Sequence, residues 1–376
     1  MKNRWCTFLF AGVFLILCTS VYASDFSVTF INPGVSDKSH ATGGFWTNVS
    51  NFMQAAADDL EIDLEVIYAE RNYLNLKNLV QEVADRSNPP DYLIIVNEKY
   101  QGTIQLEIAM SAGIKTFMML NTLVRERSIL EFGTPRMKYS DWIGSLIPDN
   151  YYAGYQNAKS TIEIALHNGA VAGDGKLHII GMAGDHVTPA STDRNEGLVA
   201  AVAEYPDVLL DQIFVCEWSK EIARDKAQKL FNRYPEVGMI WSANDPIALG
   251  AIEGTIEEGK IPGRDIFFGG LNWDIPALQA IQEGTLSLSM GGHFMTGGWV
   301  LVLLHDYENG KDFADEGINL QMKIFDEINA SNVDEYVRVF GSSDWTKIDF
   351  KHFSKVLNLN LNEYKFSLKA IFQSMK

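Results

Sequence analysis

Residues that could carry out a reaction are present in the chain, but their spacing does not form a catalytic set. Asp185, His186 and Ser191 share one short polar segment, and no Gly-x-Ser-x-Gly turn presents a nucleophile. The run 254–260 matches a phosphate loop, yet Ile261 stands where a Ser or Thr would hold magnesium. No two of the seven histidines form a zinc-binding helical pair. The sequence therefore predicts a protein that is not an enzyme, with no metal site and no cofactor.

A second group of polar and aromatic residues predicts binding. Its members follow predicted strands and supply aromatic faces, amides, an aspartate, a histidine and one arginine. They are Phe45, Trp46, Asn97, Asn121, Arg194, Trp218, Asn244, Asp245, Asn272 and His293. Aromatic faces pack on C–H surfaces, amides pair with hydroxyl groups, and a guanidinium donates to paired oxygens. Together these residues predict a pocket for a small polyhydroxylated ligand, although His293 could equally have a structural role.

Strands and helices alternate along the chain, and this order places the candidate residues at one edge of each sheet. Strands are predicted at 26–31, 64–68, 91–96, 115–120, 177–181, 213–215, 237–241, 266–268 and 285–290. Helices are predicted at 45–60, 74–84, 151–168, 194–205, 223–234, 247–258 and 275–283, with another ending near 112. Alternating units of this kind predict an α/β fold with parallel sheets. Two such units, joined near 146–150, would form a cleft at the carboxyl ends of their strands.

The composition describes an acidic globular protein. The 376 residues are 47% hydrophobic and 21% charged, and 31 Lys and Arg against 48 Asp and Glu give a net charge of −17. A surface this acidic repels phosphate groups, which argues against nucleic acid or an anionic membrane as a partner. Cys216 lies in an apolar stretch and is predicted to be a buried strand residue. Trp142, Trp241 and Trp299 lie in apolar runs and are predicted to belong to the core.

The first residues have the pattern of a secretory signal peptide. Lys2 and Arg4 precede an apolar run that ends near Cys18, and small residues follow it up to Ala23. We expect cleavage after Ala23 and a periplasmic location for the mature protein. An uncleaved anchor is the alternative, but the apolar run is shorter than the roughly 20 residues that span a bilayer. A lipoprotein attached at Cys18 is a second alternative, disfavoured by the bulky Leu17 before it.

Four segments resemble the ribose- and galactose-type periplasmic binding proteins in their order and spacing. They are 43–46, 194–198, 242–250 and 269–272, and the resemblance extends over about 26–324. It implies a type I clamshell, in which two Rossmann-like lobes with parallel sheets are joined by a multi-strand hinge and close on a sugar. The run Asn244-Asp245-Pro-Ile-Ala-Leu-Gly250 is the most specific of these segments.

The resemblance also implies domain boundaries and residue roles. After the signal peptide at 1–23, the N-terminal lobe would comprise 24–148 plus about 293–322. The C-terminal lobe would comprise 149–292 plus about 323–345, and a tail at 346–376 would pack back on the lobes. Beyond about Phe325 the sequence itself is rich in Asp, Asn and Lys, with one more amphipathic stretch at 362–375, and we expect this part of the chain to pack back as a short strand and helix. The implied roles are one aromatic wall at Phe45 and Trp46, a facing wall at Trp218, hydrogen bonds from Asn97, Asn121, Arg194, Asn244 and Asn272, and a hinge crossover at Asp149.

The chain departs from the sugar-binding pattern at positions that bear charge in the family. Asn121-Thr122 stand where Asp-Arg is common, and Asn272 stands where Asp is common, so Arg194 lacks its usual acidic neighbours. A desolvated arginine needs compensation, and we expect either Asp245 or an anionic or electron-rich ligand group to provide it. The segments 35–42 and 122–141 are insertions relative to small sugar binders. The autoinducer-2 receptor, of the same superfamily, is a second comparison for an Arg- and Trp-lined pocket.

Three functions remain open at this point. The first is delivery of a sugar or sugar-like ligand to the membrane permease of an ATP-driven ABC importer. The second is a sensory co-receptor that presents the ligand to a membrane histidine kinase or chemoreceptor, which the missing carboxylates and the two insertions keep open. The third, an exported hydrolase, is the least supported. In each case we expect a monomer whose lobes close over the ligand.

Overall fold

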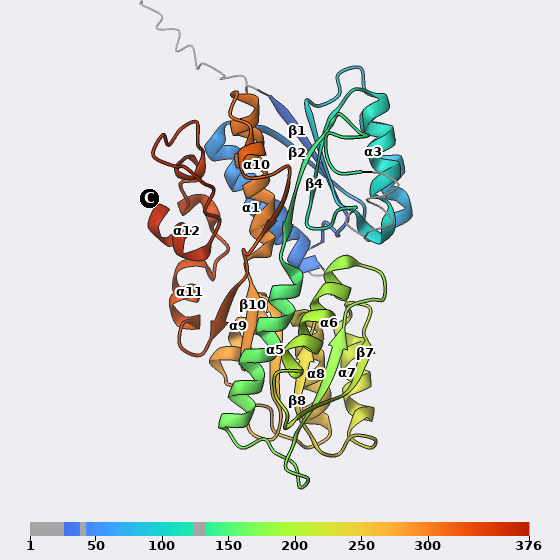
Figure 1. The fold of residues 1–376 in the computed structure, drawn as a ribbon, viewed down its shortest axis with the longest axis vertical. Helices are drawn as coiled ribbons and strands as arrows, with labels where there is room; N and C mark the ends of the chain where they lie inside the picture. Colours follow the sequence, from blue (N-terminus) through green and yellow to red (C-terminus); the bar gives the residue numbers. More distant parts are fainter. Residues whose placement is uncertain (1–25, 38–42, 124–132, 376) are drawn as a thin grey trace, which may run out of the picture.

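The computed structural model describes residues 26–37, 43–123 and 133–375 of the chain. These residues form two six-stranded sheets, each covered by helices on both faces, which lie one above the other in Figure 1. We call the unit built on the first sheet the N-terminal lobe and the unit built on the second sheet the C-terminal lobe. The predicted signal peptide lies outside the described residues, as do parts of the two predicted insertions.

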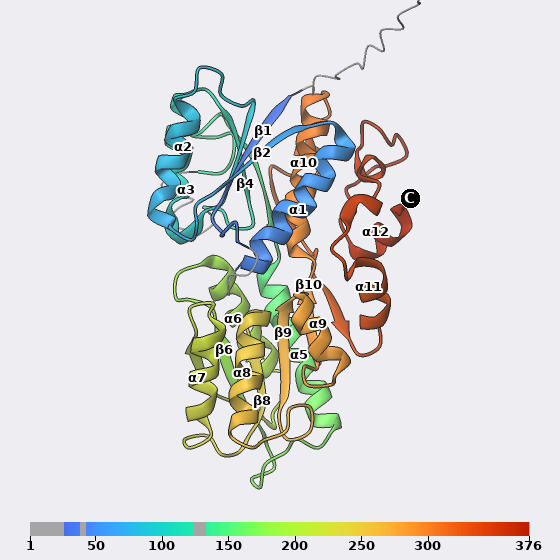
Figure 2. The same cartoon turned by 180° about the vertical axis from the view of Figure 1, so that it is seen from behind.

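The N-terminal lobe is a fully parallel sheet in the order β11-β5-β4-β3-β1-β2. Its elements are β1 (Ser27–Asn32), α1 (Gly43–Leu60), β2 (Asp63–Tyr68), α2 (Leu76–Ala84), β3 (Tyr92–Ile95), α3 (Gly102–Ser111), β4 (Lys115–Met119), β5 (Trp142–Pro148), α10 (Thr296–Glu308) and β11 (Asn319–Met322). α1 packs along α10, and α2 packs against α3; Figure 2 shows the two pairs apart, with the sheet between them.

The C-terminal lobe has the order β12-β10-β9-β8-β6-β7, parallel except for the edge strand β12. Its elements are α5 (Asn150–His167), β6 (Leu177–Ala183), α6 (Pro189–Val202), β7 (Val208–Val215), α7 (Lys220–Leu230), β8 (Val237–Ser242), α8 (Asp245–Glu257), β9 (Phe267–Asn272), α9 (Ile275–Gln282), β10 (Leu288–Gly291), β12 (Asp326–Asn329) and α11 (Val333–Phe340). A Cβ on Gly269 would meet Asn157 of α5, and one on Gly270 would meet Asp245 of α8. Because successive strand residues point to opposite faces, α5 and α8 cover opposite faces of β9.

The α/β prediction is confirmed, and the differences are local. The sequence pattern did not indicate β5, α10 or β11, whereas β12 and α11 lie beyond residue 325, where a short strand and helix were expected. The predicted helix at 194–205 begins earlier, at Pro189, where the ring fixes a helical φ and the missing N–H is not needed. Trp142, Trp241 and Trp299 are buried core residues as predicted. Cys216 is also buried, one residue beyond the end of β7, and burial raises the pKa of its thiol to about 12.

The chain passes between the two sheets at three places. The first lies between β5 and α5, the second between β10 and α10, and the third between β11 and β12. The backbone N–H of Asp149 in the first connection donates to the carbonyl of Met322 at the end of β11, 3.0 Å away. The Asp149 carboxylate also caps α5 by accepting from the N–H of Tyr152. The Asp149–Met322 bond places the first connection beside the third, and the rings of His293 and Phe325, 4.7 Å apart, place the second beside the third as well.

The segment that follows α11, residues 341–375, packs against both lobes, and we call it the C-terminal tail from here on. Trp345 contacts Phe52 of α1 and Phe340 of α11, with ring centroids 5.5 and 5.2 Å apart. Farther along, Phe366 stacks on Trp299 of α10 at 4.7 Å, and the last helix α12 (Leu368–Ser374) places Phe372 beside Phe340. An isolated β-bridge joins Ile348 to Met375 within this segment. In Figure 1 this red segment runs along one side of the molecule, next to α10 and α11.

Candidate functional site

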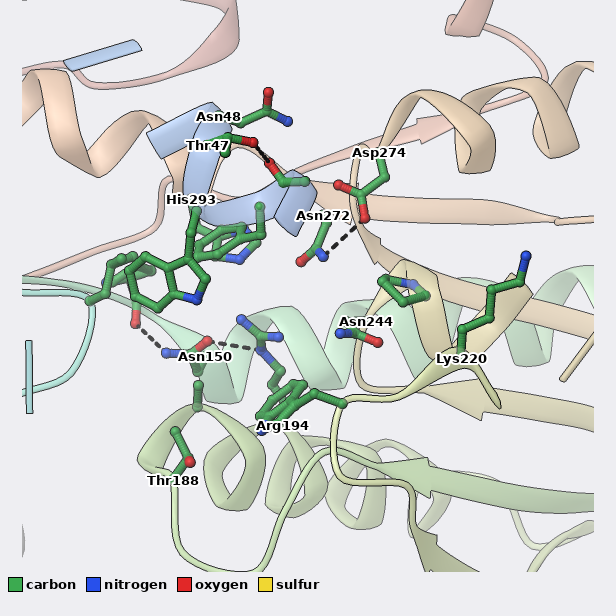
Figure 3. A pocket seen from close by; sticks show the side chains of 18 of the residues that line it. Thr47, Asn48, Asn150, Thr188, Arg194, Lys220, Asn244, Asn272, Asp274 and His293 are labelled. Atoms are coloured by element: carbon green, nitrogen blue, oxygen red, sulfur yellow. Dashed lines mark hydrogen bonds between the residues drawn. The ribbon is translucent and has the colours of Figure 1, made fainter. Parts of the chain in front are cut away.

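A cavity of about 550 Å³ lies where the carboxyl ends of the two sheets face each other (Figure 3). Its walls come from both lobes, because each parallel strand delivers the chain to this edge before the next helix begins. The N-terminal lobe contributes the first turns of α1 and the loops after β2, β3 and β4. The C-terminal lobe contributes the loops after β6, β7, β8 and β9. The volume lies in the usual range for small-molecule sites.

The N-terminal lobe presents two aromatic side chains, Phe45 and Trp46, at the start of α1. Their rings meet edge to face at 5.1 Å. Trp46 is fixed from behind, because its carbonyl accepts from Asn32 and its Cβ lies against Gly34. A Cβ on Gly34 would lie 2.2 Å from that of Trp46, so only glycine fits there. Trp46 is thus held in place by β1 and the segment that follows it, and Phe45 packs on the Trp46 ring.

Trp218, after β7, forms part of the wall in the C-terminal lobe. Its indole N–H donates to the Asp185 carboxylate at 3.0 Å, and its ring lies over Gly184. Burial raises the pKa of Asp185, but hydrogen bonds from Thr188, Val187 and Trp218 outweigh it and lower the pKa overall. Because the N–H is already bonded to Asp185, Trp218 would contact a ligand through its ring face rather than through a hydrogen bond. Trp218 has a φ of 59°, an unfavourable value for a side chain of this size.

Arg194 lies in the second turn of α6, rather than in the first turn as predicted, and is 4% exposed. Its Nε donates to Oδ1 of Asn150 at 2.9 Å, and its Nη1 donates to the carbonyl of Ala243 at 2.8 Å (Figure 3). Burial lowers the pKa of Arg194 to about 9, so the guanidinium is still charged at neutral pH. Asn150 is the first residue of α5, which ties this cation to the first connection between the lobes.

A row of rings runs from the N-terminal wall to Arg194. Phe45 stacks on His293 at 4.6 Å, and His293 lies 4.7 Å from Phe325. The guanidinium of Arg194 lies 5.8 Å from Phe325 and 5.8 Å from the Trp218 ring. His293 belongs to the second connection and Phe325 to the third. The row therefore links both walls of the cavity through two of the segments that join the lobes.

Three buried polar atoms of the lining have no hydrogen-bond partner among the described residues. They are Oδ1 of Asn121, Oδ1 of Asp274 and Nδ1 of His293. Burial, and then the charge of Arg194, lower the pKa of His293 well below its usual value, so its ring is neutral. Unpaired buried polar atoms are costly and uncommon in folded proteins. A ligand with several hydroxyl groups could form hydrogen bonds with these three atoms.

The two lobes come close at Asp274. A Cβ placed on Gly44, in the first turn of α1, would lie 3.6 Å from Oδ1 of Asp274. The other carboxylate oxygen of Asp274 accepts from Asn272 at 3.3 Å, as Figure 3 shows. Burial raises the pKa of Asp274 to about 6. This carboxylate therefore lies next to the positive end of α1, at a point where the two lobes meet.

A model of the periplasmic binding protein domain matches residues 34–312. The chain belongs to the periplasmic binding protein family. No group of His, Cys, Asp and Glu side chains in the described part of the chain is placed to hold a metal ion. In the same part of the chain, we find no helix with the length and apolar character needed to cross a membrane.

Solved structures and one curated relative extend this assignment. A periplasmic sugar-binding protein from Pseudomonas fluorescens is 36% identical, with a TM-score of 0.80, over 92% of this chain and 99% of that one. The arabinose-transporter binding protein of Shewanella sp. ANA-3 shares the fold at 18% identity and a TM-score of 0.69, over 84% of this chain and 96% of that one. The xylitol-binding protein of Mycolicibacterium smegmatis is 23% identical over 159 residues, 40% of this chain. That match spans 43% of the length of the relative.

Eight of the ten candidate residues line the cavity of this binding protein. They are Phe45, Trp46, Asn121, Arg194, Trp218, Asn244, Asn272 and His293. Asn97 and Asp245 do not line it. Asn97 is turned into the protein, where its amide accepts from the N–H of Gly102 and donates to the carbonyl of Thr122. Asp245 is fully buried and accepts from the Ser289 hydroxyl and the N–H of Asp274.

Several lining residues were not among the sequence candidates. They are polar or charged and include Arg71, Glu98, Asn150, Lys220 and Asp274. Glu98 and Asp274 follow the same strands as the candidates Asn97 and Asn272, one and two residues later. The signal was thus present at the strand ends, but the sequence does not tell which residue of each loop faces the ligand. Lys99, Tyr100 and Trp273 have positive φ values of 45°, 65° and 65°, which redirect these loops.

Proposed function

We propose that this protein is the exported, sugar-binding component of an ABC importer and binds its ligand in the cavity between the lobes. The single observation that carries the proposal is the composition of the cavity. It combines aromatic faces from opposite lobes, Trp46 and Trp218, with unpartnered buried atoms on Asn121, Asp274 and His293. A sugar offers C–H faces to the rings and hydroxyl groups to the polar atoms.

The names of related proteins support this ligand class and this partner. The Pseudomonas fluorescens relative is named a sugar-binding protein, and the Shewanella structure is named a component of an arabinose ABC transporter bound to arabinofuranose. An Actinobacillus succinogenes transporter protein holds D-allose. The membrane permease of such an importer would be the partner of this chain, and a periplasmic location after cleavage at Ala23 is part of the same proposal.

The mechanism we propose is closure of the lobes about the three connections. A ligand that contacts Trp46 and Trp218 together binds the closed arrangement better than the open one, so it shifts the population toward closure. Asp149 would serve at the hinge, since its N–H and carboxylate join β11 to the start of α5. The lobes would then move as 24–148 plus 293–322 against 149–292 plus 323–345, and the permease would recognise the closed form.

A panel of neutral sugars, polyols and sugar acids tests the proposal by thermal shift and calorimetry. A ligand that binds only the native state raises its melting temperature. Trp46→Ala and Trp218→Ala should each weaken any ligand found by tenfold or more, whereas Trp142→Phe, a substitution in the core of the N-terminal lobe away from the cavity, should leave affinity near wild type. Unchanged affinity in both cavity variants would contradict the assignment of this site.

A further inference from the structure

The charge of Arg194 is not balanced by a carboxylate in contact with it. Both of its hydrogen bonds among the described residues go to neutral oxygens, on Asn150 and Ala243. The carboxylate of Asp245 was one of the two expected sources of compensation, the other being a ligand group, and it accepts instead from Ser289 and from the N–H of Asp274. The charges of Asp193 and Asp245 oppose the fall in the pKa of Arg194 but do not outweigh the effect of burial. A buried guanidinium with neutral partners alone is a costly arrangement. The rings of Trp218 and Phe325 recover only part of that cost.

The cavity lining has more basic than acidic side chains, in an otherwise acidic protein. Three basic side chains, Arg71, Arg194 and Lys220, line its described walls, against the two acids Glu98 and Asp274. Arg71 pairs with Glu98 at 3.6 Å and Lys220 pairs with Glu253 at 2.7 Å, whereas the hydrogen bonds of Arg194 among the described residues go to neutral oxygens. The chain has the opposite balance, with 31 basic against 48 acidic residues. Burial raises the pKa of both Glu98 and Asp274, which weakens their negative contribution. The first turns of α1, α5, α6, α8 and α9 also reach this edge and add positive potential.

Another part of the cavity wall has hydrogen-bond acceptors that lack a donor. Asp274 and Asn121 each present a buried oxygen without a partner, and such oxygens accept hydrogen bonds. No ion pair joins Asp274 to Arg194 in the described chain, and each is held by separate neighbours. A ligand that satisfies both regions needs an electron-rich group at one end and hydroxyl donors at the other.

We propose that the ligand is a sugar acid, whose carboxylate pairs with Arg194 and whose hydroxyl groups donate to Asp274 and Asn121. This inference rests on the proposed function, because it names the ligand class of the same cavity. A neutral sugar fills the hydroxyl sites equally well but leaves the buried cation with neutral partners only. A carboxylate accepts from the remaining N–H groups of the guanidinium and forms a charge-assisted pair.

Matched pairs of sugars test the inference on the full mature chain. Calorimetry at pH 7.5 compares galacturonate with galactose, glucuronate with glucose, and gluconate with glucitol. We expect at least one acid to bind ten or more times tighter than its neutral counterpart, with an affinity that falls as salt increases. A neutral sugar that binds as tightly as its acid, or tighter, would overturn the inference while leaving the proposed function intact. If neither the sugar acids nor the neutral sugars of an extended panel bind, both this inference and the proposed function would be overturned.

Two variants distinguish Arg194 from the general charge of the protein. Arg194→Gln keeps an amide donor but removes the charge, and should abolish the preference for the acid. Asn150→Asp keeps Arg194 and places a carboxylate next to its Nε, so it should reduce the preference at least tenfold even if Arg194→Gln does not fold. Arg224→Gln removes an equal charge from the surface of α7, where Arg224 pairs with Glu257, and should retain the preference. A preference that survives both cavity variants would overturn the assignment.

Discussion

Nε of Arg194 donates a hydrogen bond to Oδ1 of Asn150 over 2.9 Å, which joins a cavity wall to the first residue after the crossover from β5. Both side chains are buried. Both residues belong to the C-terminal lobe, so this bond ties the cation to the point where the first connection enters that lobe. A ligand held by Arg194 is therefore coupled to the segment about which the lobes would turn.

Removing the side chain of Asn150 should weaken ligand binding. Asn150→Ala leaves a buried N–H of Arg194 without its acceptor, which costs about 1–3 kcal/mol, and it releases the guanidinium from its position. We expect an affinity loss of roughly tenfold to a hundredfold by calorimetry. Asn168→Ala, at the exposed far end of α5, provides the control. Equal affinities for the two variants would show that this bond does not position Arg194.

A methyl group at Gly184 should displace the ring of Trp218. A Cβ at this position would lie 2.2 Å from Cζ2 of Trp218, far inside contact distance. We expect Gly184→Ala to lower ligand affinity at least tenfold and to shift the tryptophan fluorescence. Gly173→Ala is the matched control, since a Cβ there meets no atom within 4 Å. Normal binding by Gly184→Ala would mean that Trp218 does not contact the ligand in its present position.

The stability of the unliganded protein should depend on pH through Asp274. Burial raises the pKa of Asp274 to about 6, whereas an unfolded aspartate titrates near 4. The folded state therefore holds the proton more tightly, so this group adds stability as the pH falls from about 7 toward 4. Other buried acids, Asp245 among them, act in the same direction. The contribution of Asp274 is therefore measured by comparing the melting temperatures of wild type and Asp274→Asn over this pH range. The difference between the two should change with pH, and parallel profiles would contradict a role for Asp274.

Truncating Trp345 should destabilise the whole protein. This buried ring contacts α1 and α11, which belong to different lobes, and loss of a buried tryptophan costs about 3–5 kcal/mol. We expect Trp345→Ala to lower the melting temperature by several degrees, with a single transition in calorimetry. Leu359→Ala, in the same tail but 87% exposed, should melt like wild type. Two separate transitions in wild type would show that the tail does not couple the lobes.

The sequence predicted the repeating elements well because their signals are local. The helix from 45 to 60 and the strands around 91–96 and 237–241 have apolar spacing that few other structures satisfy, and the structure contains them as α1, β3 and β8. Strand β5 was missed because it follows a long polar stretch that breaks the alternation. Strand β11 was missed because it has only four residues and gains its order by pairing with the distant strand β5. A short strand was expected beyond residue 325, where β12 lies, but not its bounds or its antiparallel pairing with β10.

Within the cavity, the sequence predicted the loops better than the side chains. Asn97 and Glu98 are adjacent after β3, and only the second lines the cavity, because the amide of Asn97 is taken up by Gly102 and Thr122. Two acids near β9 differ in the same way. Asp274 lines the cavity, whereas Asp245 is buried behind it and accepts a hydrogen bond from the backbone N–H of Asp274. These choices depend on backbone turns with positive φ at non-glycine residues, which have no signature in a single sequence.

The three crossings of the chain between the lobes have a consequence for biogenesis. α10 and β11, which complete the N-terminal lobe, are encoded after nearly the whole C-terminal lobe. A nascent chain emerging from the ribosome thus cannot finish its first lobe until residue 322 has been made, although domains usually fold in order of synthesis. We therefore expect the N-terminal lobe to lack its edge strand for most of translation, which would delay the completion of its folding.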